Sequence, residues 1–145
     1  MSVLKPNRGL AEPQFIQTAR ILEITTIKKC ISFPKRYTFF LTLYIAYSGW
    51  VIYRSVMKAN SIYPVNAHEV QVRRDHFANA RAELYNLTSQ IGIADEVFGL
   101  NEKTMLEWTA LIDKEISLVN GIMKKDRSRY KNIMPEEISE ENPDE

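Results

Sequence analysis

The strongest constraint on the fold is a hydrophobic repeat in the middle of the chain. Its apolar residues recur at steps of three, four or seven positions: Val70, Phe77, Ala80, Leu84, Leu87, Ile91, Ala94 and Phe98. A helix that packs against neighbouring helices in coiled-coil style needs this spacing. Asn66, followed three residues later by Glu69, resembles a helix N-cap, and Gly99 suits a helix end. The pattern predicts a helix over 67–98.

Three further segments have helical periodicity. The first runs over 13–31, the second over 35–62, and the last from Asn101 to a frayed end after Lys125. Apolar stripes support the first and the last of them: Phe15, Ala19, Leu22 and Thr26, and then Met105, Trp108, Ile112, Ile116, Val119 and Met123. Four helices with short connections predict an all-α fold, an antiparallel up-down four-helix bundle.

The charges divide the chain into a basic body and an acidic tail. The 145 residues, 45% of them hydrophobic, suit one domain with a real core. Six of the 18 acidic residues lie beyond Lys131, the last basic residue, which leaves 12 acidic against all 19 basic residues in the rest of the chain. We expect an irregular basic N-terminal segment at 1–12, the bundle at 13–132 and a disordered acidic tail at 133–145.

The second helix contains an uncharged run of 17 residues, Tyr37–Tyr53. This length is at the lower limit for a membrane span, and the run includes several hydroxyl residues and four tyrosines. A helix that is apolar nearly all round can instead be buried by its own bundle on one side and by another subunit on the other. The composition favours the buried or subunit-interface interpretation, and a single-pass membrane protein is the alternative.

Residues that could perform chemistry are few and scattered. His68 and His76 lie eight residues apart, which separates them by about 12 Å along a helix, too far to share a metal without other ligands. Cys30 has no second thiol, so we expect a structural thiol in a reducing, cytoplasmic compartment. The sequence has no glycine-rich phosphate loop and no Gly-x-Ser-x-Gly motif. We expect a protein that is not an enzyme and carries no cofactor or metal.

Basic residues gather once the up-down topology is imposed. The end of the second helix, the start of the third and the end of the fourth meet at one pole of such a bundle. The cations expected there, as candidate nucleic-acid-binding residues, are Arg54, Lys58, Arg73, Arg74, Lys124, Lys125, Arg127 and Arg129, followed by Lys131. Arginine and lysine at this pole can neutralise phosphates. Alternatively, they are solvated residues that complement the helix dipoles.

Several segments resemble a known family of small bacterial and phage helical proteins. They are the opening Met1–Lys5, the block Phe33–Phe40, the run Lys58–Pro64, the pair Arg73-Arg74 and the stretch Ser89–Ile91. These strings resemble the accessory variability determinant (Avd) proteins of diversity-generating retroelements, and the likeness spans roughly residues 1–127.

The resemblance implies a homo-oligomeric four-helix-bundle protein, typically a pentamer. It further implies a non-catalytic accessory subunit that binds a reverse transcriptase and its template RNA through basic surfaces. A helical adaptor that binds only protein is a further alternative, because the resembling strings include no chemical signature of RNA binding.

Overall fold

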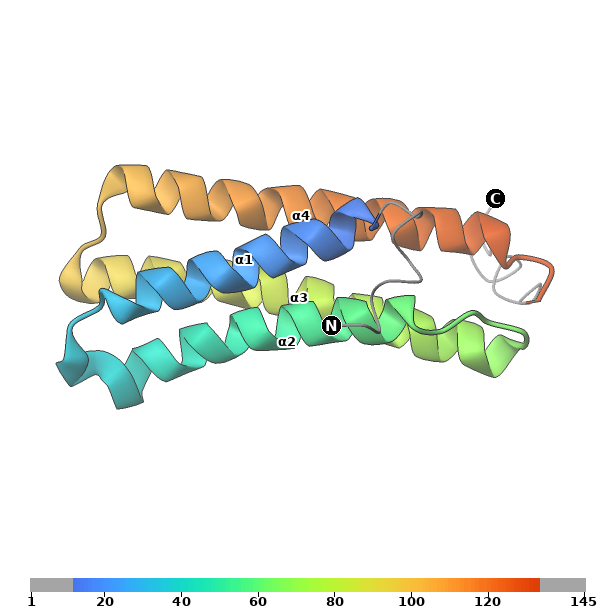
Figure 1. Ribbon diagram of the computed structural model, residues 1–145, viewed down its shortest axis with the longest axis horizontal. Helices are drawn as coiled ribbons and strands as arrows, with labels where there is room; N and C mark the ends of the chain where they lie inside the picture. Colours follow the sequence, from blue (N-terminus) through green and yellow to red (C-terminus); the bar gives the residue numbers. More distant parts are fainter. Residues whose placement is uncertain (1–11, 134–145) are drawn as a thin grey trace, which may run out of the picture.

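Four helices pack side by side in the computed structural model, which describes residues 12–133. They are α1 (Gln14–Ile31), α2 (Leu43–Asn60), α3 (Ala67–Phe98) and α4 (Glu102–Arg129). α2 packs against α1 and α3, and α4 packs against the same two helices, so the four enclose one core (Figure 1). The predicted all-α fold, an antiparallel four-helix bundle, is confirmed. The expected N-terminal segment 1–12 and tail 133–145 lie, except for Glu12 and Ile133, outside the described residues.

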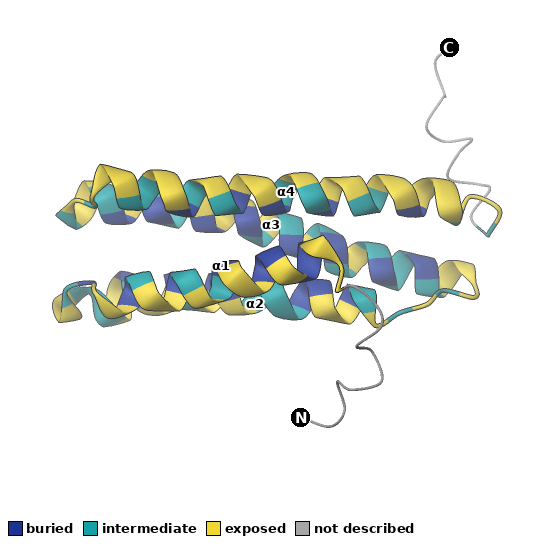
Figure 2. Ribbon diagram, turned by 45° about the horizontal axis from the view of Figure 1, so that its top comes forward, coloured by how far each residue is buried: buried dark blue, intermediate teal, exposed yellow. Residues whose placement is uncertain are grey.

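The repeat predicted for α3 forms the centre of this core. All its members are buried except Phe98, which is partly buried and packs against the core. Trp108 and Ile112 of α4 and Leu22 of α1 contribute fully buried side chains from the neighbouring helices. The buried residues accordingly line the inside of every helix, and the exposed ones line the outside (Figure 2). Burial of this apolar surface is the main force that holds the helices together.

Local signals fix the ends of α3 and the start of α4 as the sequence predicted. The Asn66 side chain accepts a hydrogen bond from the Glu69 amide at 2.9 Å, and Glu69 accepts one from the Val65 amide at 3.0 Å. Gly99 ends α3 with a φ of 76°, a conformation that glycine adopts without a steric penalty. Asn101 caps α4 by accepting a hydrogen bond from the Thr104 amide. These contacts satisfy amides that the first helical turns leave unpaired.

The second predicted helix begins differently from the expectation. A 3-10 turn (Lys35–Tyr37) and a π-helical turn (Thr38–Thr42) precede α2, where the sequence suggested one continuous α-helix from 35. A π turn holds one residue more than an α turn and shifts the side chains that follow. Leu41 is thereby buried, whereas Phe39 and Phe40 are 77% and 82% exposed.

In the α2 part of the uncharged run Tyr37–Tyr53, the residues on one side of the helix are buried and those on the opposite side are exposed. Ile45, Gly49 and Ile52 face the core, while Tyr47 and Trp50 lie exposed and stacked on each other. α1, which packs against α2, also has exposed apolar residues. We call the exposed apolar residues of these two helices the α1–α2 face: Ile24, Ile27, Ile31, Leu43, Tyr44, Tyr47, Trp50 and Met57. None of the helices within residues 12–133 combines the length and the apolar character that a bilayer crossing requires.

Candidate nucleic-acid interface

Three cations lie together on the outer side of the C-terminal part of α4. Lys124, Lys125 and Arg129 line a shallow surface hollow with Gly121 and Ser128. Residues three and four positions apart lie on one face of a helix, so the helix itself holds these side chains next to one another. Lys124 and Arg129 are separated by about 7.5 Å along the axis. We call this group the cationic face, and it is the strongest candidate for phosphate contact in the described chain.

Gly121 forms part of the hollow and has no packing role that requires glycine. A Cβ atom on Gly121 would meet no atom of residues 12–133 within 4 Å. Glycine in an exposed helix interior costs roughly 0.5–1 kcal/mol relative to alanine. The absence of a side chain here leaves the helix backbone open between the cations, and a side chain at this position would extend into the hollow.

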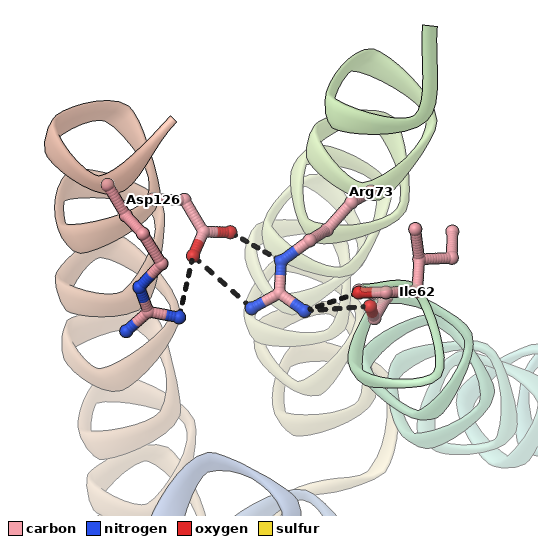
Figure 3. Close-up of polar contacts among 5 residues, drawn as sticks. Ile62, Arg73 and Asp126 are labelled. Atoms are coloured by element: carbon pink, nitrogen blue, oxygen red, sulfur yellow. Dashed lines mark hydrogen bonds and ion pairs between the residues drawn. The ribbon is translucent and has the colours of Figure 1, made fainter. Parts of the chain in front are cut away.

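Arg73 is the predicted site residue that the structure contradicts most clearly. Its guanidinium is buried between helices and donates from Nε to Oδ2 of Asp126 at 2.6 Å and from Nη2 to Oδ1 at 3.2 Å (Figure 3). Its Nη1 donates to the backbone oxygens of Ala59 and Ile62, both at 3.1 Å. A buried guanidinium with these partners is poorly placed to contact a phosphate, so the structure does not support the prediction of nucleic-acid contact by Arg73.

The burial of Arg73 follows from its place in the α3 repeat. The apolar series passes from Val70 to Phe77 in one step of seven, and Arg73 occupies the intervening inward position. Its guanidinium lies 5.1 Å from the centroid of the Phe77 ring, which adds a cation–π contact. Asp126 is the matching polar residue on α4. A buried charge is tolerated where a partner and hydrogen bonds compensate its lost hydration.

The adjacent Arg74 and the α4 residue Arg127 also have partners. Arg74 is partly buried and lines a small, partly open cavity between α3 and α4 with Val70, Met123 and Asp126. Arg127 is exposed on the last turns of α4. Both arginines already take part in interactions within the protein. Both lie at the predicted pole, with their charges already engaged within the protein. Arg129 of the cationic face is engaged as well, since its Nη1 lies 4.0 Å from Oδ1 of Asp126.

Arg54 is separate from the other predicted cations. It donates to Oε2 of Glu23 in α1 at 2.6 Å, and its guanidinium lies over the rings of Trp50 and Tyr53 at 5.2 and 5.3 Å. Its place is therefore on the α1–α2 side of the bundle. Lys58 lies exposed in the last turn of α2, and Lys131 lies exposed just beyond α4. The α4 cations therefore lie close to one another, and the other predicted cations do not join them. Arg73 lies in the interior, Arg54 on the α1–α2 side, and Lys58 at the exposed end of α2.

Glu115 is a buried polar residue that the sequence analysis missed. It is fully buried in the α4 stripe, and within residues 12–133 neither carboxylate oxygen has a hydrogen-bond partner. Burial raises the pKa of Glu115 to about 8, and the nearby Lys114 charge lowers it only in part. Glu115 is therefore protonated at neutral pH. The signal was present in the sequence, because Glu115 follows Ile112 by three residues and precedes Val119 by four, as a core position does.

The thiol and the histidines form no cluster. Burial raises the pKa of the Cys30 thiol to about 11, so that the reactive thiolate is scarce at neutral pH. His68 is exposed and His76 is partly buried on the same helix. Between residues 12 and 133, no group of three or more histidine, cysteine, aspartate or glutamate side chains could hold a metal ion.

Comparison of the chain with protein-family models, with curated proteins and with solved structures finds no match.

Proposed function

We propose that this chain is a non-catalytic, self-associating accessory subunit that binds RNA together with a reverse transcriptase in the cytoplasm. The observation that carries the RNA part is the cationic face: Lys124, Lys125 and Arg129 around one hollow. Phosphate neutralisation by such side chains supplies most of the affinity in sequence-independent nucleic-acid binding. Three parts of the proposal rest on the resemblance to Avd proteins: the reverse-transcriptase partner, the template RNA and the pentamer.

The self-associating part of the proposal is supported by the α1–α2 face. Exposed apolar patches that extend over two helices are a common mark of protein–protein interfaces. This face contains aromatic residues, which are enriched at such interfaces, and Tyr47 and Trp50 are 60% and 45% exposed on it. The cationic face lies elsewhere, on the outer side of α4. An assembly formed through α1 and α2 thus leaves the RNA-binding residues accessible.

RNA binding can be tested with a labelled single-stranded RNA of mixed sequence, titrated at several salt concentrations. Replacing Lys124 and Lys125 with alanine should weaken binding and lower the slope of log K against log salt by about 0.7 for each lost phosphate contact. The matched control replaces Lys103 and Lys114, two exposed lysines on the same helix, with alanine. Both double variants lose the same charge, so only a local site separates them.

Equal binding by the two double variants would contradict the proposed site. If the parent protein binds no RNA at low salt, the protein-only adaptor becomes the preferred function, and the α1–α2 face becomes the surface to test. Deleting the acidic tail 133–145, which except for Ile133 lies outside the described residues, should strengthen non-specific RNA binding, because acidic residues can compete with RNA for the same cations.

A further inference from the structure

The last turns of α4 project beyond the start of α1. Trp108 of α4 donates its indole N–H to Oγ1 of Thr26 in α1 at 3.1 Å, which fixes the register of these two antiparallel helices. Gln14, the first residue of α1, lies as many residues before Thr26 as Asn120 lies after Trp108. Residues 121–129 of α4 therefore have no turn of α1 beside them, as Figure 1 shows.

This projecting segment contains the whole cationic face but little buried surface. Beyond Val119, Asp126 is the one α4 residue that is buried in the described chain. Ile122 and Met123 are partly buried against the core. A helical end with so few buried contacts opens easily unless a specific interaction holds it.

The Asp126 carboxylate makes that interaction. It accepts two hydrogen bonds from Arg73, which also donates to the carbonyl oxygens of Ala59 in the last turn of α2 and of Ile62 just beyond that helix. One guanidinium thus joins the projecting part of α4 to α3 and to α2. Oδ1 of Asp126 also lies 4.0 Å from Nη1 of Arg129, a member of the cationic face. The same carboxylate connects the buried anchor with the exposed site.

We propose that Arg73 and Asp126 are positioning residues for RNA: they keep residues 121–129 helical and docked, and so hold the cationic face in its binding geometry. The inference rests on the proposed function. A cationic segment that is already ordered binds without the entropy loss that a loose segment suffers when it becomes ordered on its ligand. Arg73 thereby supports RNA binding without touching the RNA.

The decisive variant is Asp126→Asn, because positioning and simple electrostatics predict opposite signs for it. The substitution removes a negative charge beside the cationic face, so a purely electrostatic role predicts tighter binding of the single-stranded RNA. A positioning role predicts binding weakened by roughly threefold or more, because Asn keeps the size of the side chain but loses the ion pair with Arg73 and one of the two oxygens that accept from it. Amide hydrogen exchange of residues 121–129 should become faster, while that of α3 stays slow.

A second variant, Arg73→Met, has a matched control in Arg81→Met. Arg81 also links α3 to α4, through a hydrogen bond from Nη1 to Oδ1 of Asn120 at 3.0 Å. Its partner Asn120 lies before the projecting segment 121–129, so this bond does not hold that segment. Both variants lose one positive charge from α3. We expect faster exchange in 121–129 and roughly tenfold weaker RNA binding for Arg73→Met than for Arg81→Met.

The inference and the proposed function can fail separately. If the parent protein binds no RNA, the proposed function fails. Independently of RNA, amide exchange of residues 121–129 that is the same in Asp126→Asn and Arg73→Met as in the parent would exclude the anchoring role. If the parent binds RNA and the Lys124/Lys125 variant does not, the site stands. Tighter binding by Asp126→Asn, or exchange that accelerates without any loss of affinity, would then overturn the positioning role alone.

Discussion

Trp108 of α4 and Thr26 of α1 are joined by a buried hydrogen bond from the indole Nε1 to the threonine Oγ1, 3.1 Å long. The two residues lie 82 positions apart in the sequence, so the bond ties the first helix to the last. Both side chains are completely buried. If Thr26 loses its hydroxyl group, the buried indole N–H cannot donate to solvent water instead.

Thr26→Val should therefore lower the free energy of unfolding by about 1–3 kcal/mol, the usual penalty for a buried donor without an acceptor. Valine keeps the shape of threonine, so packing against Gly49 is retained. Urea denaturation followed by circular dichroism measures the change. In a Trp108→Phe background the same substitution should cost clearly less, because no N–H remains to be satisfied. Equal costs in the two backgrounds would show that the hydrogen bond contributes nothing.

Glu115 should make the stability of the bundle depend on pH. Its pKa is raised to about 8 in the folded protein from an ordinary value of 4.5, so between these values the folded state keeps a proton that the unfolded state releases. Stability from this group is complete below pH 4.5, falls as the pH rises, and levels off above about pH 8. Denaturation at about pH 6, 7 and 8 should show this decline.

Glu115→Gln should remove that pH dependence, because the amide has nearly the same shape and does not titrate. The difference in unfolding free energy between variant and parent should grow in favour of the glutamine variant over the same pH range, by on the order of a few kcal/mol in total. A constant difference from about pH 6 to 8 would mean that Glu115 is ionised in the folded protein. Other titrating carboxyls are common to both proteins and cancel in the comparison.

Gly121→Ala should separate stability from RNA binding. The new methyl group meets nothing within 4 Å, so the free energy of unfolding should rise by roughly 0.5–1 kcal/mol through the better helix propensity of alanine. Gly92 on α3 is equally unobstructed, and Gly92→Ala should give a similar gain. Only Gly121→Ala should also weaken RNA binding, because only Gly121 lies in the hollow. Identical RNA affinities for the two variants would argue against use of the hollow.

The α1–α2 face should hold the protein in an assembly larger than a dimer, without detergent. Tyr47→Glu places a charge in the middle of this face and should release monomers, because a desolvated, unpaired carboxylate is costly in an interface. Leu106→Glu on α4 is the control, since Leu106 is 63% exposed and Tyr47 is 60% exposed. Light scattering measures the mass in solution. A monomeric parent protein, or equal dissociation by both variants, would contradict self-association through this face.

The predictions from the sequence differ from the structure mainly at the polar residues of the core. Apolar spacing was enough to predict the bundle and the α3 repeat, because a helix that buries one face must repeat every three or four residues. The same spacing includes Arg73 on α3 and Glu115 and Asp126 on α4. The sequence analysis assigns Arg73 to the surface and does not identify Glu115 or Asp126 as core residues. A charged side chain is usually exposed, and one sequence gives no sign of the partner that would make burial acceptable.

The sequence by itself determined that there are four helices, the caps of α3 and α4 and the core stripes, since these depend on contacts between residues close in the chain or on a regular period. It did not determine the start of α2 or the end of α4, which continues to Arg129 where fraying was expected after Lys125. The tertiary structure decided which cations are available. Arg73 and Asp126 are 53 positions apart, and only packing of α3 against α4 brings them to 2.6 Å. The cationic face was already implicit in the helical spacing of Lys124, Lys125 and Arg129. The burial of Arg73 was not, because the energy of a charge depends on its three-dimensional surroundings, which the linear order of residues does not specify.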